Sequence, residues 1–229
     1  MSWFASYLRS TIGAKHLMAV TGLGLVVFAI AHMLGHLLMF PGQESYNAYA
    51  HGLQSLGALL WALRIGLLVI FILHMVMGIR LAARNRAARP VSYVAYKTKV
   101  TSLAARTMAV SGIALFIFIA FHLGHFTFGL VQPEHFHNLD SQGRYDAYNM
   151  FVAGFQSPIY YLVYLVAIMI LSSHLGHGAS SWLQSLGWQH PKYRGIIDNL
   201  GSVISVVLFL GYMAPPTAVL LGFLKPVGA

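Results

Sequence analysis

The chain has 229 residues, of which 58% are hydrophobic and 8% are charged, and it contains no cysteine. Together with a mean hydropathy of +0.68, this composition is typical of a polytopic membrane protein and excludes an ordinary soluble domain. The lack of cysteine excludes disulfides, iron–sulfur clusters held by this chain's own thiolates and thioether-linked cofactors.

Long apolar segments follow one another along the chain, each near or above the roughly 20 residues needed to cross about 30 Å of hydrocarbon. They cover about residues 14–40, 55–83, 106–131, 157–186 and 200–224. We therefore expect an all-α polytopic membrane protein with five spanning helices in one domain, residues 1–229. The first segment is too long, and too weakly charged on its leading side, for a cleaved signal peptide.

An internal repeat organises these segments. Residues 18–22 (MAVTG) recur as residues 108–112 (MAVSG), and residues 46–49 (YNAY) recur as residues 145–148 (YDAY). We infer a duplicated helical hairpin, with halves at about 14–84 and 106–186, followed by a fifth helix at 200–224.

Charged residues indicate the orientation of the chain. The connection between the second and third segments is basic and contains no acid: Arg80, Arg84, Arg86, Arg89, Lys97, Lys99 and Arg106. Arg9, Lys15, Lys192 and Arg194 fall on the same side, and Glu44, Glu134, Asp140 and Asp146 on the other. The positive-inside rule then places the N-terminus inside and the C-terminus outside. Insertion topology, anionic lipid headgroups and an acidic partner account for the net charge of +9, so we expect no nucleic-acid binding.

Each of the first four segments contains one histidine that the repeat relates to a histidine of another segment. His122 follows His32 by 90 residues, and His174 follows His74 by 100. At about 1.5 Å rise per residue, His74 and His174 lie about 14 and 18 Å from the inner ends of their segments, and His122 and His32 about 24 and 27 Å. Two imidazoles at one depth on facing helices can fill both axial positions of a heme. The pattern predicts two stacked bis-histidine hemes, His74/His174 on the inner side and His32/His122 on the outer side, suited to electron transfer.

Further polar residues accompany these histidines. Arg64 is the one charge in a predicted span that lies far from the span's inner end, about 28 Å away. A buried arginine needs an anion such as a heme propionate, and snorkelling to the outer interface is the alternative. His36, His125 and His177 lie three or four residues beyond the predicted ligands on the same helix faces. A hydrogen bond to a ligand, a propionate contact and quinone binding stay open for them.

With these motifs the chain resembles, over nearly its whole length, a family of membrane subunits. This is the five-helix, single-polypeptide diheme cytochrome b subunit that anchors succinate:quinone oxidoreductases (succinate dehydrogenase, respiratory complex II) and quinol:fumarate reductases. The resemblance rests on the five-span layout and on four short motifs: residues 31–33 (AHM), His74-x3-Gly78, residues 121–122 (FH) and His174-x3-Gly178. It implies that the second and fourth helices hold the heme b nearest the catalytic subunits, and that the first and third hold the distal one.

The resemblance also implies partners and a place for the chain in respiration. A flavoprotein subunit would interconvert succinate and fumarate, as in the tricarboxylic acid cycle, and an iron–sulfur subunit would dock on the inner, basic face. Electrons would pass through both hemes to or from a quinone, of the menaquinone type, in a bacterial cytoplasmic membrane. The chain itself would not bind succinate. Reaction direction, heme potentials and oligomerisation of the complex stay open.

Two details of the family bear on quinone and proton chemistry. Some members carry a glutamate two residues before the fourth ligand as part of a proton path. Ser172 stands there in this chain, so we do not expect that route. Candidate quinone ligands lie in the predicted outer loops and, for one histidine, on the inner side: Glu44, His51, Gln54, Gln156 and His16.

Other functions stay open at this point. The chain could be the cytochrome b subunit of another quinone-linked complex, of the nitrate-reductase or hydrogenase type. Histidines in the last segment would favour the nitrate-reductase type, and that segment has none. A histidine-containing transporter or proton channel should carry acids along its pathway, and no predicted span contains one. A purely structural anchor leaves the four matched histidines unexplained.

Overall fold

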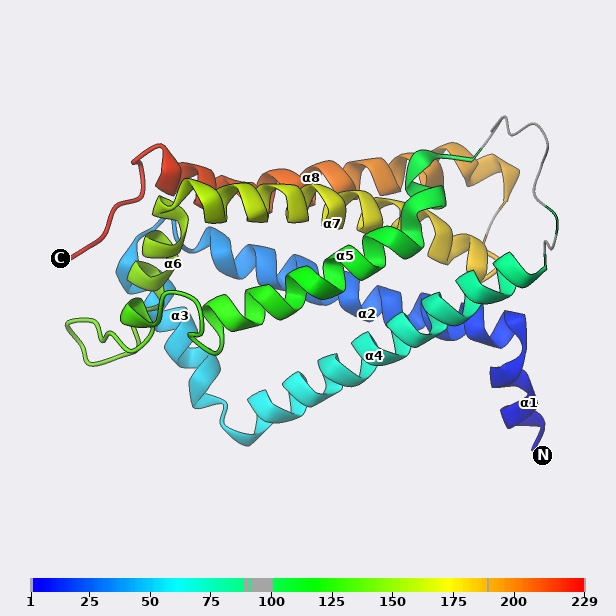
Figure 1. Cartoon of the computed structure of the whole chain (residues 1–229), viewed down its shortest axis with the longest axis horizontal. Helices are drawn as coiled ribbons and strands as arrows, with labels where there is room; N and C mark the ends of the chain where they lie inside the picture. The colour runs from blue at the N-terminus through cyan, green and yellow to red at the C-terminus, as the bar shows by residue number, and fades with distance from the viewer. Residues whose placement is uncertain (1, 89–90, 92–100, 189, 229) are drawn as a thin grey trace. The chain divides into compact units, whose positions relative to one another are not determined.

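A computed structural model describes residues 2–88, 91, 101–188 and 190–228. Within these ranges the chain is helical, and an isolated bridge between Leu139 and Tyr145 is the only extended pairing. Five of the helices in Figure 1 are long and apolar enough to cross a membrane. They are α2 (Thr11–Leu37), α4 (Ala58–Ala87), α5 (Leu103–Phe126), α7 (Pro158–Ser185) and α8 (Arg194–Leu220). The chain is therefore an all-α integral membrane protein, which confirms the predicted fold class.

Shorter helices that the apolar pattern did not predict connect the spans. They are α1 (Trp3–Arg9), α3 (Gln43–Ser55) and α6 (Ala147–Gln156), with 3₁₀ turns at Pro133–His135 and Pro191–Tyr193. The ends of the spans also differ from the prediction. Helix α5 ends at Phe126 instead of near residue 131, because the chain leaves the helix before Gly129, whose φ of 62° is not helical.

Contacts between residues divide the chain into two compact units. Unit 1 consists of Met1–Phe28, Arg64–Ile113 and Ser173–Ser205, and unit 2 of Ala29–Leu63, Ala114–Ser172 and Val206–Ala229. Each spanning helix contributes a segment to both units, so this division cuts across the predicted repeat halves. His74 and His174 belong to unit 1, and His32 and His122 belong to unit 2.

In unit 1, helices α7 and α8 pack through small residues. A Cβ on Gly201 would stand 2.2 Å from the Gly176 carbonyl oxygen and 2.1 Å from Ser180 Oγ, and a Cβ on Gly176 would stand 2.7 Å from the Gly201 carbonyl oxygen. Ser180 Oγ donates a hydrogen bond across to the Ile197 carbonyl at 3.3 Å. Glycine at these two positions lets the helix backbones approach closely, as in other membrane helix pairs.

Basic residues of unit 1 hold the end of α1. Arg80 donates hydrogen bonds to the carbonyl oxygens of Leu8 at 3.3 Å and Arg9 at 2.7 Å, and Arg84 donates to the Arg9 carbonyl at 2.9 Å. Cations at a helix C-terminus satisfy its free carbonyl groups. The contact places Arg9 beside the basic end of α4, which agrees with their predicted location on one side of the membrane. Arg89, Lys97 and Lys99 lie outside the described residues.

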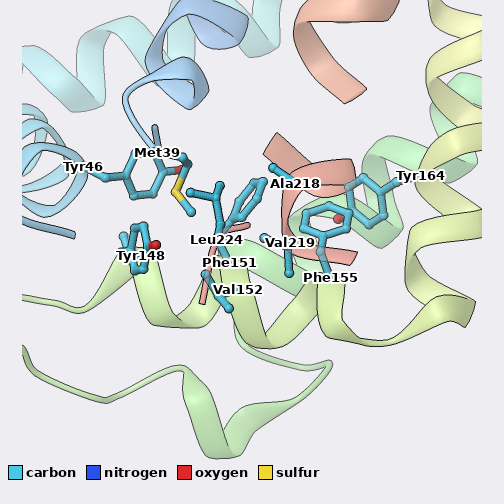
Figure 2. Close-up of a cluster of buried hydrophobic side chains, with 11 residues drawn as sticks. Met39, Tyr46, Tyr148, Phe151, Val152, Phe155, Tyr164, Ala218, Val219 and Leu224 are labelled. Carbon is cyan, nitrogen blue, oxygen red and sulfur yellow. The ribbon is translucent and has the colours of Figure 1, made fainter. Parts of the chain in front are cut away.

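Unit 2 contains a cluster of buried apolar side chains centred on α6 (Figure 2). Tyr148, Phe151, Val152 and Phe155 follow the i, i+3, i+4, i+7 spacing of one helix face, and each is at most 5% exposed. The ring of Tyr164, from α7, packs edge-on against Phe155 with ring centres 4.8 Å apart. Helix α3 packs against α6. This cluster fixes the segment that follows α5 and the beginning of α7.

The second repeat motif forms a polar contact within unit 2. Asn47 and Asp146 occupy the same position of the repeat, and Asn47 Nδ2 donates a hydrogen bond to Asp146 Oδ1 at 3.0 Å. Asn47 is fully buried, and its Oδ1 accepts from the Tyr148 backbone N–H at 2.9 Å. The two equivalent residues therefore meet each other and join α3 to the start of α6.

An ion-pair group lies beside this contact. Arg144 bonds Asp140 at 2.8 Å and Glu44 at 2.7 Å. Burial opposes the charge of Asp140, but hydrogen bonds from Arg144 and Asn47 outweigh it and lower the pKa of Asp140 to about 2. The hydrogen bond from Arg144 likewise lowers the pKa of Glu44. Both acids are thus kept ionised and tied to one arginine.

Replacing Gly201 by alanine tests the close packing of α7 and α8. The added methyl group would meet a backbone carbonyl that cannot move aside, so we expect a loss of about 1–3 kcal/mol in the free energy of unfolding. Gly66→Ala in α4 is the matched control, because no atom outside its own helical backbone lies within 4 Å of its Cβ position in the described part of the chain. Thermal unfolding in detergent compares them. Equal Tm values for the two variants would contradict the packing.

Candidate heme-binding sites

The structure brings His74 and His174 together in unit 1. Their ring centres lie 6.5 Å apart, with the ring planes inclined by 68°. An imidazole nitrogen binds a metal at about 2.0 Å, and the ring centre lies about 1.2 Å behind that nitrogen, so two imidazoles on opposite sides of one metal have ring centres about 6.4 Å apart. The separation of the two rings therefore suits a shared iron atom.

The hydrogen bonds of His74 determine which ring nitrogen is free. Its Nδ1 lies 3.2 Å from the Met18 carbonyl oxygen and 3.4 Å from Thr21 Oγ1. A carbonyl oxygen can only accept, so Nδ1 of His74 carries the proton. Thr21 Oγ1 donates its own proton to the Leu17 carbonyl at 2.7 Å and is also left as an acceptor. In the neutral ring, Nε2 then has the lone pair that a metal requires.

His174 is held in the same way by the second copy of the repeat. Its Nδ1 lies 2.9 Å from Ser111 Oγ, and Ser111 Oγ donates its proton to the Met108 carbonyl at 3.0 Å. With its proton on the Met108 carbonyl, the hydroxyl accepts from Nδ1–H of His174 and Nε2 keeps its lone pair, whereas a hydroxyl that donated to Nδ1 would require the other tautomer. Both rings are fixed by a partner on a neighbouring helix, the arrangement usual for metal-ligating histidines.

The repeat motif itself thus supplies residues that sequence patterns alone had not assigned to the site. Thr21 and Ser111 are equivalent residues of that motif, and each is followed by a glycine. A Cβ on Gly22 would stand 3.1 Å from Cε1 of His74, and a Cβ on Gly112 would stand 3.7 Å from Cε1 of His174. The motif therefore combines a hydroxyl that contacts the imidazole with a glycine that leaves space for the imidazole ring. The near-identity of the two copies was the sequence signal for this role.

The glycines one turn after the histidines have a different environment. Gly78 and Gly178 lie four residues beyond His74 and His174 on the same helix faces. In the described part of the chain, no atom outside the helical backbone lies within 4 Å of a Cβ position on either one. Protein packing does not require glycine here, and the open space leaves room for a flat macrocycle beside the imidazoles. Donor set and space both fit a heme.

His32 and His122 meet in unit 2. Their ring centres lie 5.9 Å apart, with the planes inclined by 83°, and Nδ1 of His122 lies 3.2 Å from the Tyr164 hydroxyl. Nε2 of His32 lies 3.2 Å from Nε2 of His36, whose Nδ1 contacts the Tyr46 hydroxyl at 2.8 Å. A metal bound to Nε2 of His32 would replace its hydrogen bond to His36. The ring separation suits a shared iron atom, and His36 is a neighbour of the candidate ligand His32.

Other predicted site residues are less closely associated with these pairs. Arg64 lies in α4 with an exposed side chain, so its bond to a heme propionate stays a prediction. His177 is partly buried in α7, three residues after His174. Ser172 Oγ is buried without a hydrogen-bond partner among the described residues.

The placement of the candidate quinone ligands in loops was wrong. Glu44, His51 and Gln54 lie within α3, and Gln156 ends α6, because polar residues can also form a connecting helix when one face packs on neighbours. Glu44 is engaged by Arg144. His16 Nδ1 lies 2.5 Å from the Tyr7 hydroxyl.

Comparisons with known proteins identify no relative. No protein-family model matches this chain, and no curated protein or solved structure matches it either. Across the described residues, no group of three or more His, Cys, Asp or Glu side chains is arranged to hold a bare metal ion. The two histidine pairs are therefore the candidate sites on which the function has to be argued.

Removing the acceptors of the repeat motif tests how the His74/His174 pair is held. In a Thr21→Val, Ser111→Ala variant both rings lose a partner of Nδ1, and we expect heme affinity at this pair to fall by about 10- to 100-fold. The rate of heme transfer to excess apomyoglobin measures it. Thr107→Val is the control, since the Thr107 hydroxyl bonds only carbonyl oxygens of its own helix. Unchanged transfer in the double variant would contradict this role.

A leucine at Gly78 tests the space beside the imidazoles. Gly78→Leu would occupy the volume assigned to the macrocycle, so we expect the purified protein to lose one heme while its helicity is retained. Gly66→Leu, on the same helix and with an equally open Cβ position, should keep both hemes. Heme content and circular dichroism provide the comparison. Full heme content in Gly78→Leu would show that the macrocycle lies elsewhere.

Proposed function

We propose that this chain is the membrane-anchoring, diheme cytochrome b subunit of a succinate:quinone oxidoreductase or quinol:fumarate reductase. The proposal is supported by one observation above all. Two histidine pairs, each made of residues that the repeat relates, face each other at ring separations of 6.5 and 5.9 Å.

Ring contact alone would not distinguish ligands from packed aromatic residues, whose centres commonly lie about 4.5–7 Å apart. The nitrogen assignments add the necessary distinction. His74 directs Nδ1–H at the Met18 carbonyl of another helix, which keeps its Nε2 unprotonated. His174 places Nδ1 against the Ser111 hydroxyl of another helix, and it has the same tautomer when that hydroxyl accepts. A histidine that only packed between helices would have no need for one tautomer. A ligand does, because only a deprotonated ring nitrogen can bind iron.

Each group of residues has a defined task in this proposal. His74 and His174 would hold one heme b, and His32 and His122 the other. Bound heme supplies a one-electron carrier with both axial positions filled. Met18, Thr21 and Ser111 accept the Nδ1 protons, which increases the electron donation of the rings and fixes their orientation.

The charge distribution supports the proposed partners. Arg80 and Arg84, at the end of α4, lie beside Arg9, and an iron–sulfur subunit with its flavoprotein would dock on this basic face from inside the cell. Quinone, of the menaquinone type, would exchange electrons with the hemes within the bilayer. A transporter or proton channel is less well supported, because the four spans that carry the histidines contain no aspartate or glutamate.

Alanine variants of the four histidines test the proposal. A redox titration of the purified protein should resolve two heme components. We expect His74→Ala and His174→Ala to abolish one component, and His32→Ala and His122→Ala to abolish the other, because each heme loses one of its two ligands. In native membranes, succinate should reduce the hemes and fumarate should reoxidise at least one of them.

His51→Ala is the control for the histidine variants, since His51 is exposed on α3, outside the spanning helices. It should retain both components. Loss of the same component in His32→Ala and His74→Ala would contradict the pairing. Two hemes that respond to quinol but not to succinate would assign the chain to another quinone-linked complex.

A further inference from the structure

Gln132, in the connection after α5, has an unusual backbone. Its φ of 55° and ψ of 56° place it in the left-handed region, and it is the only residue other than glycine with a positive φ in the part of the chain described. Residues with a Cβ rarely adopt this conformation unless their surroundings require it, and such residues are found preferentially at functional sites. The side chain of Gln132 has a specific contact, because its Oε1 lies 3.0 Å from Nε2 of His125.

This contact determines every proton in a chain of hydrogen bonds. Oε1 of Gln132 can only accept, so Nε2 of His125 is protonated and its Nδ1 is an acceptor. Nδ1 of His125 lies 3.2 Å from the Tyr164 hydroxyl, which must therefore donate to it. Having used its proton, the same hydroxyl accepts from Nδ1–H of His122 at 3.2 Å. Nε2 of His122 is then the nitrogen left with a lone pair.

The chain of hydrogen bonds is enclosed by aromatic rings. His125 is 3% exposed and Tyr164 is 5% exposed. The Phe126 ring stacks on His125 with centres 4.0 Å apart and planes inclined by 22°, and Phe118 packs edge-on against Tyr164 at 5.1 Å. Hydrogen bonds are stronger in such a water-poor environment, and neighbouring bonds polarise one another. The direction of donation along these hydrogen bonds is therefore well determined.

We propose that Gln132, His125 and Tyr164 are positioning residues for His122, forming a relay that holds His122 in the tautomer able to bind iron and lowers the potential of the heme held with His32. The inference rests on the proposed function. Donation of Nδ1–H into the relay makes the His122 imidazole a stronger electron donor, which stabilises ferric iron over ferrous iron. It also assigns a role to His125, which the repeat leaves without an equivalent.

The test compares midpoint potentials of the two hemes in the purified protein. Tyr164→Phe removes the hydroxyl, and Gln132→Met removes the acceptor at the end of the relay while keeping the length of the side chain. Both should raise the potential of the His32/His122 heme, and a tenfold weaker preference for ferric iron corresponds to about 59 mV for a one-electron couple. The potential of the His74/His174 heme should not change.

Matched variants separate the relay from general effects on packing. Tyr161→Phe removes a hydroxyl of the same helix that bonds Thr217 instead, and it should leave both potentials unchanged. Gln132→Glu keeps an acceptor for His125 and should leave the potential at or below that of the unaltered protein. A merely structural role for Gln132 would not distinguish the methionine variant from the glutamate variant.

The outcomes are distinguishable. If Tyr164→Phe and Gln132→Met both keep the midpoint potentials of the unaltered protein, the relay is overturned and the proposed function is left intact. If Tyr164→Phe loses its heme, Gln132→Met decides, because its side chain lies outside the spanning helix. An equal shift in Tyr161→Phe would also overturn the relay. Absence of heme from the unaltered protein would overturn the proposed function and, with it, this inference.

Discussion

An imidazole inside a membrane-spanning helix needs a partner for both of its nitrogens, because hydrocarbon supplies no hydrogen bonds. The arrangement of the histidine pairs follows from how this requirement is met. At His74 a carbonyl of a neighbouring helix accepts the Nδ1 proton, and at His174 and His122 a hydroxyl contacts Nδ1. Where the partner accepts, the nitrogen that remains on the ring is unprotonated. We infer that heme iron is the partner for that second nitrogen.

The internal repeat explains why the histidines meet in pairs. In a parallel duplication, equivalent residues face each other across the axis that relates the two halves. Within unit 1 this brings His74 to His174, and within unit 2 it brings His32 to His122 and Asn47 to Asp146. A single hairpin that presents one histidine at each level can therefore form complete bis-histidine sites once it is duplicated. The acceptor that supports each ring is duplicated with it.

Much of this arrangement was predictable from the sequence, and the exceptions have physical reasons. Hydropathy predicted the five spans, and the repeat spacing predicted both histidine pairs, because helical rise converts sequence position into depth. Helices α3 and α6 were missed because both are too short to cross a bilayer, although the apolar spacing of one face of α6 was a local signal. The contact of Asn47 with Asp146, which joins α3 to the start of α6, is contained in no local pattern. The left-handed backbone of Gln132 was equally unpredictable, since no glycine marks the position and its contact with His125 forms only in the folded chain. The repeated motif marked Ser111 in the sequence, but its contact with His174 depends on how the helices pack.

Heme ligation by the two histidine pairs is tested most directly by the amount of heme b per polypeptide in the unaltered protein, purified in mild detergent after expression with ample heme. A pyridine hemochrome assay with a parallel protein determination measures it. Two hemes per chain is the predicted result, one for each histidine pair. Protein that is folded and helical but contains no heme would contradict this ligation, because the four imidazoles would then require another partner.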